Sequence, residues 1–593
     1  MKTIFLLLFS VSLFANDIKH ITLLGTNDIH GSLEEEVHPK LGRLGSFAFF
    51  GGVVDSIRKG VAKKHGENGG VLLLDAGDQF QGTLLSNYSE GELVFKLMDL
   101  LKYDSVIPGN HDYDFGPQGW LDDKVNKENP DKNPRGAFEK IIKQVHFPLL
   151  SANTYLKSSI QTSKGQPISV ESDRCAFSKD LGEIDWSKAT RPNFLNPYLI
   201  KTIAGVRIAV IGMDNAKTSS MTTAENVSDL CFRNELETYL EIRNTLKDRA
   251  DIFVLLIHSG DTNKETTVSE LVTKINQKGQ NVDAVIAGHT HFVNDLKVGN
   301  VPVIQSSANG QAFGRIDLSW DATEKRLLPE QTQKQGGILL FKEKCDFKAK
   351  TFCKELKGQI FYENVLVEES DSLRAEIQKA RTAIAPLATK KLGVATATIT
   401  KDRILESPLA NRLTDSMRTL IGADLAILNS GGLRADLQKG DVTYEDLFRV
   451  LPFSNRAVRV GPMSKTKLLS LISNSIKSCG AFGPIVQSGL HVSFERNCEG
   501  PDVKNGIDPK ARLLKVVVDA TGKEINLDDA TENAFEVATL DFIADGGDNF
   551  AEFKKLPLIE KYDIFREMLV KSLEKNPFLW DDSIDGRWKN QTP

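Results

Sequence analysis

Three features are missing from this 593-residue sequence, and each absence excludes a class of protein. None of the six cysteines stands in a Cys-x-x-Cys pair, which argues against a zinc ribbon or a dithiol redox motif. Beyond the N-terminus, no apolar run reaches the roughly 20 residues of a transmembrane helix. The chain also lacks an excess of positive charge. Its formal net charge of −5 gives no reason to expect a nucleic-acid polymer or an anionic membrane as a partner.

The N-terminus contains an apolar run that differs from those of the rest of the chain, because a positive charge precedes it and a small residue follows it. Lys2 precedes the apolar stretch 4–14, which is followed by Ala15 and polar residues. This order is typical of a secretory signal peptide, so we expect residues 1–15 to be one. The C-terminal stretch 580–593 is polar and lacks the hydrophobic tail of a lipid-anchor signal. The sequence therefore predicts an exported protein, periplasmic or secreted, without a stable membrane anchor.

An even number of cysteines in an oxidising compartment suggests disulfide bonds. Fifteen pairings are formally possible for six cysteines. Neighbours in sequence favour one set, which is Cys345 with Cys353, Cys479 with Cys498, and Cys175 with Cys231. Cys175 lies within the polar stretch 158–196, which we expect to be an irregular excursion, and 116–139 is interpreted as a surface insert.

A chain of this length is too long for one hydrophobic core, so two domains are expected. In the first half, short apolar runs are followed by Gly-containing turns rich in Asp, Asn or His. The runs are 21–24, 71–74, 105–108, 252–257 and 282–286. Such runs are typical of buried strands. Stretches with helical character lie between several of them, at 92–101 and 235–249, and this alternation predicts an α/β layered fold.

The polar groups after these strands form a candidate metal site, because layered α/β folds bind ligands at the carboxyl ends of their strands. Five of the ten histidines lie in such turns, whereas His146 does not. Seven oxygen or nitrogen donors and no thiolate are available: Asp28, His30, Asp78, Asn110, His258, His289 and His291. This donor set suits Zn²⁺ or Mn²⁺. Seven donors exceed the needs of one tetrahedral ion and fit two ions that share a carboxylate.

These motifs carry a family resemblance. Asp28-x-His30, Gly77-Asp78, Gly109-Asn110-His111-Asp112, His258 and Gly288-His289-Thr290-His291 resemble, in order and spacing, the five blocks of the calcineurin-like metallophosphoesterases. More narrowly, the stretch 26–31 and the second half of the chain resemble the secreted 5′-nucleotidase / UDP-sugar hydrolase family. The resemblance implies a four-layer αββα metallophosphoesterase domain at 18–365, a linker helix at 366–388, and a smaller α/β (α+β) substrate-binding domain at 389–580.

The resemblance also implies a role for each residue of the candidate site. Asp28, His30 and His291 would hold one divalent ion, and Asn110, His258 and His289 the other, with Asp78 bridging the two. His111 would act on the scissile phosphate and Asp114 would orient its ring. Asp75 and Asp112 occupy no motif position in the family, and we interpret both as structural.

The second half supplies the other set of expected site residues. Residues 368–385 combine charge with apolar residues at helical spacing and predict a connecting helix that ends near Pro386. Beyond it, three blocks resemble those of the nucleotidase C-terminal domain: 429–434, 450–453 and 541–548. The resemblance implies that Phe453 and Phe542 sandwich a nucleobase with Asp548 and Asn429 nearby, and that Arg403 and Arg434 hold the phosphate. It also implies a rotation of this domain about the linker helix.

The leading hypothesis is an exported, two-metal phosphohydrolase that acts on nucleoside 5′-monophosphates and also on UDP-sugars, NAD or similar diphosphates. Small nucleotides are its expected partners, in a monomer or homodimer. A nearby alternative is a 2′,3′-cyclic nucleotide 2′-phosphodiesterase / 3′-nucleotidase, which shares the metal motifs. From another class, the chain could be a catalytically decayed nucleotide-binding or adhesion protein. The competent residues at all seven ligand positions and at His111 argue against decay.

Overall fold

The computed structural model describes residues 17–38, 40–119, 133–162, 165, 184–262, 266–480, 485–503, 506–519, 522–525 and 534–592. The expected signal peptide, Cys175 and most of the insert at 116–139 lie outside these residues. Among the helices that the structure describes, none combines the length and the apolar character needed to cross a membrane.

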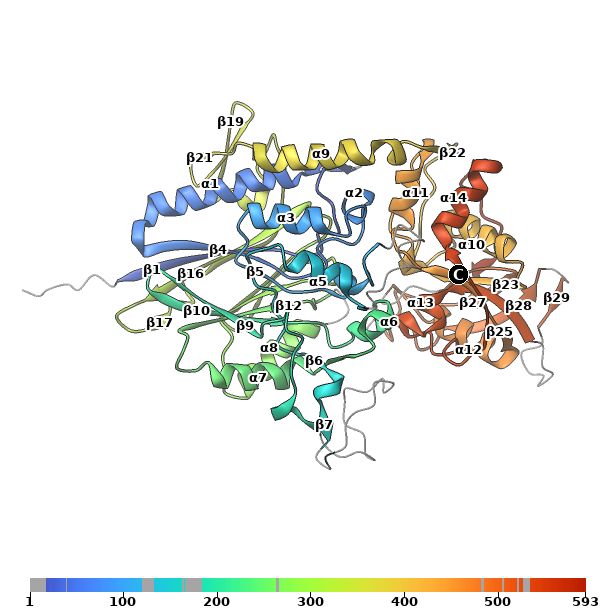
Figure 1. Cartoon of the computed structure of the whole chain (residues 1–593), viewed down its shortest axis with the longest axis horizontal. Coiled ribbons are helices and arrows are strands. Elements are labelled where there is room, and N and C mark those ends of the chain that lie inside the picture. Colours follow the sequence, from blue (N-terminus) through green and yellow to red (C-terminus); the bar gives the residue numbers. More distant parts are fainter. Residues whose placement is uncertain are drawn as a thin grey trace, which may run out of the picture.

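The first half of the chain contains two six-stranded sheets (Figure 1). In the first sheet, β1 (Ile18–Thr26) lies between β16 (Ala312–Asp321) and β4 (Gly69–Asp75). The short strand β5 (Ser105–Val106) continues the sheet beyond β4, and β17 (Arg326–Leu327) and β18 (Gln333–Leu339) pair with β16. Because β1, β4 and β5 are parallel, their carboxyl ends meet at one edge.

The second sheet has the order β14 (Val293–Val298), β15 (Val301–Ser306), β13 (Ala284–Ala287), β12 (Ile252–Ile257), β10 (Val206–Met213) and β9 (Tyr198–Ile203). Its four central strands are parallel to one another, and β9 and β14 are antiparallel edges. The predicted runs at 21–24, 71–74 and 252–257 lie within β1, β4 and β12, which confirms them as buried strands.

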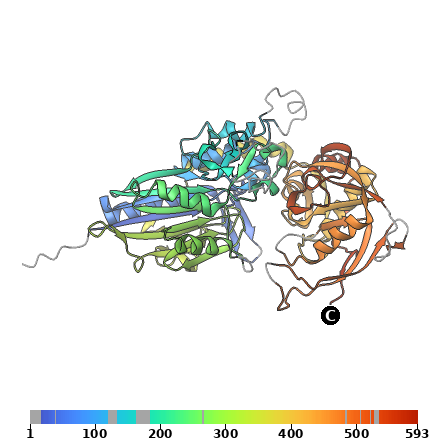
Figure 2. The same ribbon diagram turned by 90° about the horizontal axis from the view of Figure 1, so that it is seen from below.

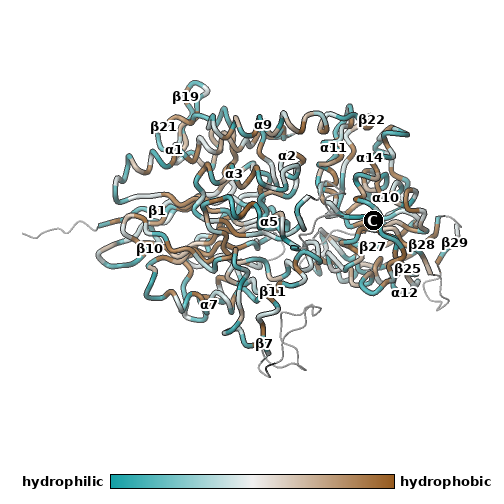
Figure 3. The backbone as a smooth tube through the Cα atoms, in the orientation of Figure 1, coloured by the Kyte–Doolittle hydropathy of each residue, from teal (hydrophilic) through white to brown (hydrophobic). Residues whose placement is uncertain are grey.

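The two sheets pack face to face between outer helices. Side chains alternate along a strand. Ile21 and Leu23 of β1 therefore face β10 and β12, whereas Leu24 points outward to α1 (Phe47–His65) and α3 (Glu92–Leu100). On the other side, α7 (Glu235–Thr245) and α8 (Thr267–Gln277) cover the second sheet. The expected four-layer αββα arrangement is confirmed, and Figure 3 shows the hydrophobic residues gathered in its strands.

A long helix, α9 (Asp371–Ala388), leads from the first half of the chain to the second. It packs on α1 and α3, and it also contacts α11 (Tyr444–Val450) of the second half, above which it runs in Figure 1. Pro386 lies inside the helix rather than at its end. Only two residues of the helix follow Pro386. The one backbone hydrogen bond that proline cannot donate therefore belongs to the last turn.

The second half is a separate α/β unit, visible beside the first in Figure 2. Its main sheet has the order β26 (Ile485–Ser488), β23 (Leu425–Asn429), β30 (Ala534–Leu540), β25 (Arg456–Ser464) and β31 (Leu558–Ile564). Two smaller sheets are built from β24 (Gly440–Thr443), β22 (Lys391–Ala395) and β32 (Leu579–Trp580), and from β29 (Lys523–Glu524), β28 (Arg512–Val518), β27 (Leu490–Glu495) and β33 (Trp588–Asn590). Helices α10 (Pro408–Ile421), α12 (Lys465–Ile476) and α14 (Phe565–Lys575) pack on these strands.

Two of the predicted disulfides are present, Cys345 with Cys353 and Cys479 with Cys498. The first closes a short loop that leads into β19 (Cys353–Leu356), and the second ties the end of α12 to the segment after β27. The third predicted pair includes Cys175, which lies outside the described residues.

The two halves of the chain touch through polar contacts. The guanidinium of Arg381 in α9 donates to Glu34 of the first half and, at 2.8 and 2.9 Å, to Glu445 of the second. Arg449 forms an ion pair with Glu36 at 3.3 Å. The buried amide of Gln81 donates to the carbonyl oxygen of Pro452 at 3.3 Å. These contacts hold the segment 34–36 and the turn after β4 against α11 and the loop that follows it.

Candidate functional site

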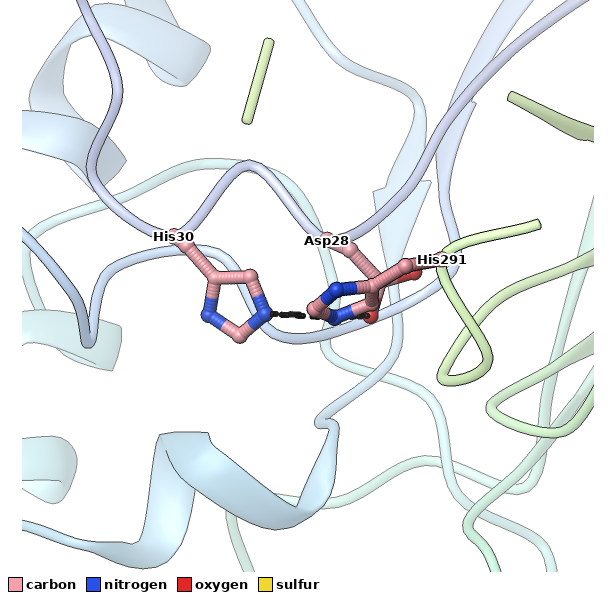
Figure 4. A group of neighbouring side chains, drawn as sticks. All are labelled: Asp28, His30 and His291. Atoms are coloured by element: carbon pink, nitrogen blue, oxygen red, sulfur yellow. Dashed lines mark hydrogen bonds and ion pairs between the residues drawn. The ribbon is translucent and has the colours of Figure 1, made fainter. Parts of the chain in front are cut away.

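The first group of candidate metal ligands is Asp28, His30 and His291, which point toward one another in Figure 4. The Nε2 atoms of His30 and His291 lie 3.0 Å apart. Asp28 Oδ1 lies 3.4 Å from Nε2 of His291 and 3.9 Å from Nε2 of His30. Two imidazole nitrogens and a carboxylate oxygen that converge at this spacing can share one divalent cation.

A second group, Asp78, His258 and His289, lies next to the first. Asp78 Oδ2 is 3.2 Å from Nε2 of His258 and 3.8 Å from Nε2 of His30, so this carboxylate faces both groups. The side-chain oxygen of Asn110 is 3.2 Å from Nε2 of His258 and adds a fourth donor. The structure thus brings together all seven donors found in the sequence.

Backbone contacts set the orientation of the ligands. The Nδ1 atom of His30 lies 2.8 Å from the carbonyl oxygen of Gln81, and Nδ1 of His258 lies 2.7 Å from that of Ala76. A carbonyl partner at Nδ1 fixes the tautomer that leaves Nε2 free as a metal ligand. The amide of Asn110 is oriented in the same way, because its Nδ2 donates to the carbonyl oxygen of Met221 at 3.0 Å.

The backbone of the ligand turns adopts conformations that the sequence did not reveal. Five of the seven donor residues have positive φ: Asp28 at 50°, His30 at 49°, Asp78 at 58°, His289 at 76° and His291 at 59°. For residues other than glycine, this left-handed region costs about 1 kcal/mol or more each. Such strain gathers at functional sites, where the surrounding structure enforces it.

Two glycines are required by close approach rather than by turn shape alone. A Cβ atom at Gly109 would lie 2.2 Å from Oδ1 of Asp78, and one at Gly77 would lie 2.5 Å from Nδ1 of His258. The Gly-Asp and Gly-Asn-His-Asp motifs therefore need glycine so that the β4 and β5 turns can approach the ligand set.

The charges of the cluster favour bound cations. Burial lowers the pKa of both His30 and His289 to about 3, so these rings are neutral and able to coordinate metal. Burial opposes a charge on His258 as well, but the carboxylates of Asp78 and Asp28 outweigh it and raise the pKa of His258 to about 10. Positive charge is thus stabilised next to Asp78, where the second cation would bind.

His111 belongs to neither ligand group. Its Nδ1 lies 2.7 Å from Oδ2 of Asp114, and its backbone N–H donates to Oδ1 of Asp78 at 2.8 Å. Burial would lower the pKa of His111, but Asp114 and Asp78 raise it above its usual value. The ring thus lies beside both groups of candidate ligands, next to a carboxylate that favours its protonated form.

Asp112, next in sequence, holds the turns together. Its carboxylate accepts hydrogen bonds from the backbone N–H groups of Asp78, Gln79 and Gly109 at 2.9, 3.0 and 2.7 Å. Asp75 has a similar position, accepting from Thr26 at 2.6 Å and from the side-chain amide of Gln79 at 2.7 Å. These contacts fit the structural interpretation of both residues.

Replacing Asp112 by alanine should destabilise the first domain, because three buried N–H groups lose their acceptor. Each unsatisfied group costs about 1–3 kcal/mol, so we expect a loss of about 3 kcal/mol or more after partial relaxation. Thermal unfolding measures the effect against Asp371→Ala, whose side chain is 95% exposed. A variant as stable as this control would contradict the structural role of Asp112.

Two of the predicted residues of the second half are hydrogen-bonded to each other. Asn429 ends β23, and its Nδ2 donates to Oδ2 of Asp548 at 2.6 Å. Phe542 lies in α13 (Asp541–Ala544), and a Cβ at Gly547 would come within 2.5 Å of its ring, which explains a glycine there. Arg403 is exposed and Arg434 is half-buried.

The two halves meet at His111. The ring of Phe453 stacks on that of His111, with centroids 5.0 Å apart and an interplanar angle of 28°. The guanidinium of Arg434 lies 5.6 Å from the centre of the same phenyl ring and interacts electrostatically with Asp28, Asp78 and Asp114. Phe453 and Arg434 therefore lie beside the candidate metal centre.

Sequence reasoning missed several residues near the site. Gln81, through its backbone and its amide, links His30 to Pro452 next to Phe453. Lys401 lies beside Arg403 and Arg434, and burial together with these two charges lowers its pKa to about 8. Thr222 contacts Asp114. None of the three stands in a recognisable motif, and their roles depend on contacts between segments far apart in sequence.

The sequence matches two family models and several known proteins. A family model for calcineurin-like phosphoesterases matches residues 21–293, and one described as 5′-nucleotidase, C-terminal domain, matches residues 384–555. The trifunctional nucleotide phosphoesterase protein YfkN of Bacillus subtilis is 25% identical over 96% of this chain, which spans only 36% of that protein. The 5′-nucleotidase of Bos taurus is 26% identical over 90% of this chain and 84% of its own length.

The fold also resembles solved structures. The 5′-nucleotidase precursor from Thermus thermophilus superposes with a TM-score of 0.67 at 20% identity, covering 97% of this chain and 100% of the other. The likeness extends over both halves of the chain, so the order of the two domains is shared.

Proposed function

The chain belongs to the calcineurin-like phosphoesterases that carry a 5′-nucleotidase C-terminal domain, and we propose that it is a two-metal hydrolase that releases phosphate from nucleoside 5′-monophosphates. One observation carries the proposal. The ring of Phe453, from the domain expected to bind nucleoside, stacks on His111, beside two groups of candidate metal ligands. Base recognition and phosphate chemistry then occur at one place.

The residues present fit a pair of divalent ions. Asp28, His30 and His291 would hold one ion, and Asn110, His258 and His289 would hold the other, with the carboxylate of Asp78 available to both groups. Oxygen and nitrogen donors without thiolate favour Mn²⁺ or Zn²⁺. Bound there, such ions supply charge neutralisation for phosphoryl transfer and make water a better nucleophile.

The chain's own side chains position the substrate and stabilise charge. His111, its ring oriented by Asp114, donates a hydrogen bond to the phosphoryl group as negative charge develops. Arg434 and Arg403 neutralise the remaining phosphate charge, since guanidinium forks match phosphate geometry. Phe453 and Phe542 stack on the base, while Asn429 and Asp548 bond to the nucleoside.

We assign the domains as 18–365 and 389–580, joined by a linker at 366–388, and the protein as exported after removal of residues 1–15. Neither half contains a complete site, so turnover requires the contact between the two domains. UDP-sugars and NAD would bind to the same residues, because their diphosphate would lie between the two groups of metal ligands and the side chains of Arg403 and Arg434.

A panel of substrates tests the function. We expect the Mn²⁺-loaded chain to release phosphate from AMP and UMP faster than from 3′-AMP, and to leave 2′,3′-cyclic AMP largely intact. A preference for the cyclic substrate would favour the 2′,3′-cyclic nucleotide 2′-phosphodiesterase. Absence of turnover with every substrate, in a chain that binds nucleotide, would indicate a decayed enzyme.

Removing the phenyl ring of Phe453 or Phe542 should reduce activity toward substrates that contain a nucleobase. Stacking of a base on an aromatic side chain is worth about 1–3 kcal/mol, so Phe453→Ala or Phe542→Ala should lower kcat/KM for AMP by about 10- to 100-fold. Ribose 5-phosphate, which lacks the base, is the control and should lose much less. Equal losses for the two substrates would contradict the stacking role.

A further inference from the structure

The segment 218–227 of the first domain lies between the catalytic turn and the nucleoside-binding loop. Its 3₁₀ turn, η5 (Thr218–Ser220), packs against η8 (Gly547–Asn549) of the second domain, and α6 (Ala224–Val227) follows. Between these two elements stand Met221 and Thr222, and both contact residues of the η2 turn (Asn110–Tyr113) or its C-terminal neighbour Asp114.

Thr222 is buried, and its hydroxyl donates to Oδ1 of Asp114 at 2.8 Å. The other carboxylate oxygen, Oδ2, lies 2.7 Å from Nδ1 of His111. The terminal torsion of an aspartate is broad, so a carboxylate held at one oxygen can turn about it. The hydroxyl of Thr222 holds the second oxygen and thereby fixes the plane in which His111 is held.

The neighbouring residue performs the matching task for Asn110. The carbonyl oxygen of Met221 accepts from Nδ2 of Asn110 at 3.0 Å, which leaves Oδ1 of Asn110 3.2 Å from Nε2 of His258. Met221 therefore orients Asn110, which is expected to bind metal. Its neighbour Thr222 orients His111 through Asp114, and His111 is expected to act on the phosphate.

The hydroxyl of Thr222 is not needed to shape the turn itself. The side-chain amide of Asn226 donates to the backbone carbonyl oxygens of Tyr113 and Asp114 at 2.8 and 3.0 Å. The backbone of the turn is thus held by a different residue, and the contact from Thr222 reaches only the carboxylate of Asp114.

We propose that Thr222 is a positioning residue for catalysis: through Asp114 it holds the ring of His111 toward the scissile phosphate. The inference rests on the proposed function, because it assumes that His111 contacts the phosphoryl group. Since η5 contacts η8, docking of the nucleoside-binding domain and alignment of His111 depend on the same segment.

The test compares Thr222→Val, which keeps the shape of the side chain, with Thr222→Ser, which keeps the hydroxyl. Loss of such an outer contact costs about 10- to 100-fold in activity. We expect Thr222→Val to lower kcat by that factor, with KM within about twofold and both metal ions retained, and Thr222→Ser to restore most of kcat. Thr223→Val is the matched control, because the Thr223 side chain forms no capping hydrogen bond.

A double-mutant cycle separates positioning from a general structural effect. In the His111→Ala background, Thr222→Val should cause no further loss, because its target is gone. Full kcat in Thr222→Val, a loss that serine does not restore, or an equal loss without His111 would overturn the proposal. If Thr222→Val does not fold, Thr222→Ala carries the same comparison.

The kinetics use whichever phosphate ester the wild-type chain hydrolyses fastest. Failure of AMP as a substrate would thus reject the proposed nucleotidase activity and leave the role of Thr222 measurable. If no phosphate ester is hydrolysed at all, both proposals are rejected together.

Discussion

Replacing His111 by alanine should lower kcat by about 10²–10⁴-fold and leave both metal ions bound, because His111 is expected to act as a donor beside the metal centre. His111 belongs to neither ligand group, and its Nδ1 is bonded to Asp114 rather than directed at the carboxylates of Asp28 or Asp78. Its loss removes a charge-stabilising contact in the transition state and leaves seven metal donors in place.

The measurement is phosphate release at saturating AMP together with metal content by elemental analysis. The matched control is His146→Ala, because the His146 side chain is 91% exposed and pairs with Asp99 rather than with any candidate site residue that the structure describes. That variant should behave as the wild type. A His111→Ala protein that has lost metal would refute its assignment outside the metal shell.

Replacing Asp78 by alanine should abolish activity by a different route, the loss of the metal centre. One oxygen of Asp78 faces both His258 and His30, at 3.2 and 3.8 Å, and the other accepts from the backbone N–H of His111. Without this carboxylate, two cations lose the charge that lets them lie close together. Activity falls below detection, and added Mn²⁺ does not restore it.

Metal content shows whether the loss of activity comes from the loss of bound ions. Asp295→Ala is the control, because this aspartate pairs with Lys334 at the surface. We expect the Asp78 variant to bind fewer than two ions per chain and the control to bind two. An Asp78→Ala protein that keeps both ions and a tenth of the activity would exclude the bridging role.

Much of the fold was predictable because local sequence and final structure agree. Runs such as 252–257 are apolar throughout, since both faces of a central parallel strand are buried. The turns that follow these strands contain the candidate metal ligands, since parallel strands bring their carboxyl ends to one edge of the sheet. The post-strand position of His258, His289 and His291 therefore predicts that these side chains lie together.

Element ends were less predictable. Helix α10 begins at Pro408, because Ser407 caps it and proline fits the first turn. The linker helix continues through Pro386 to Ala388, because a proline near a helix end disrupts only one hydrogen bond.

The remaining features of the site depend on tertiary structure. The left-handed backbone of Asp28 and His30 results from the packing of neighbouring turns, and the preference of Asp and His for this region is too weak to predict it. Thr222 lies 108 positions from its partner Asp114, and Gln81 lies 371 positions from Pro452. Single hydrogen bonds across such separations leave no periodic signal in one sequence.

The central claim is that one active site combines two metal ions with a nucleoside-binding domain. It is tested most directly by phosphate release from AMP as Mn²⁺ is added to the metal-depleted, full-length chain. We predict that activity rises until two ions are bound per chain and then stays constant. Full activity with a single ion, or no release of phosphate from AMP at any metal content, would contradict it.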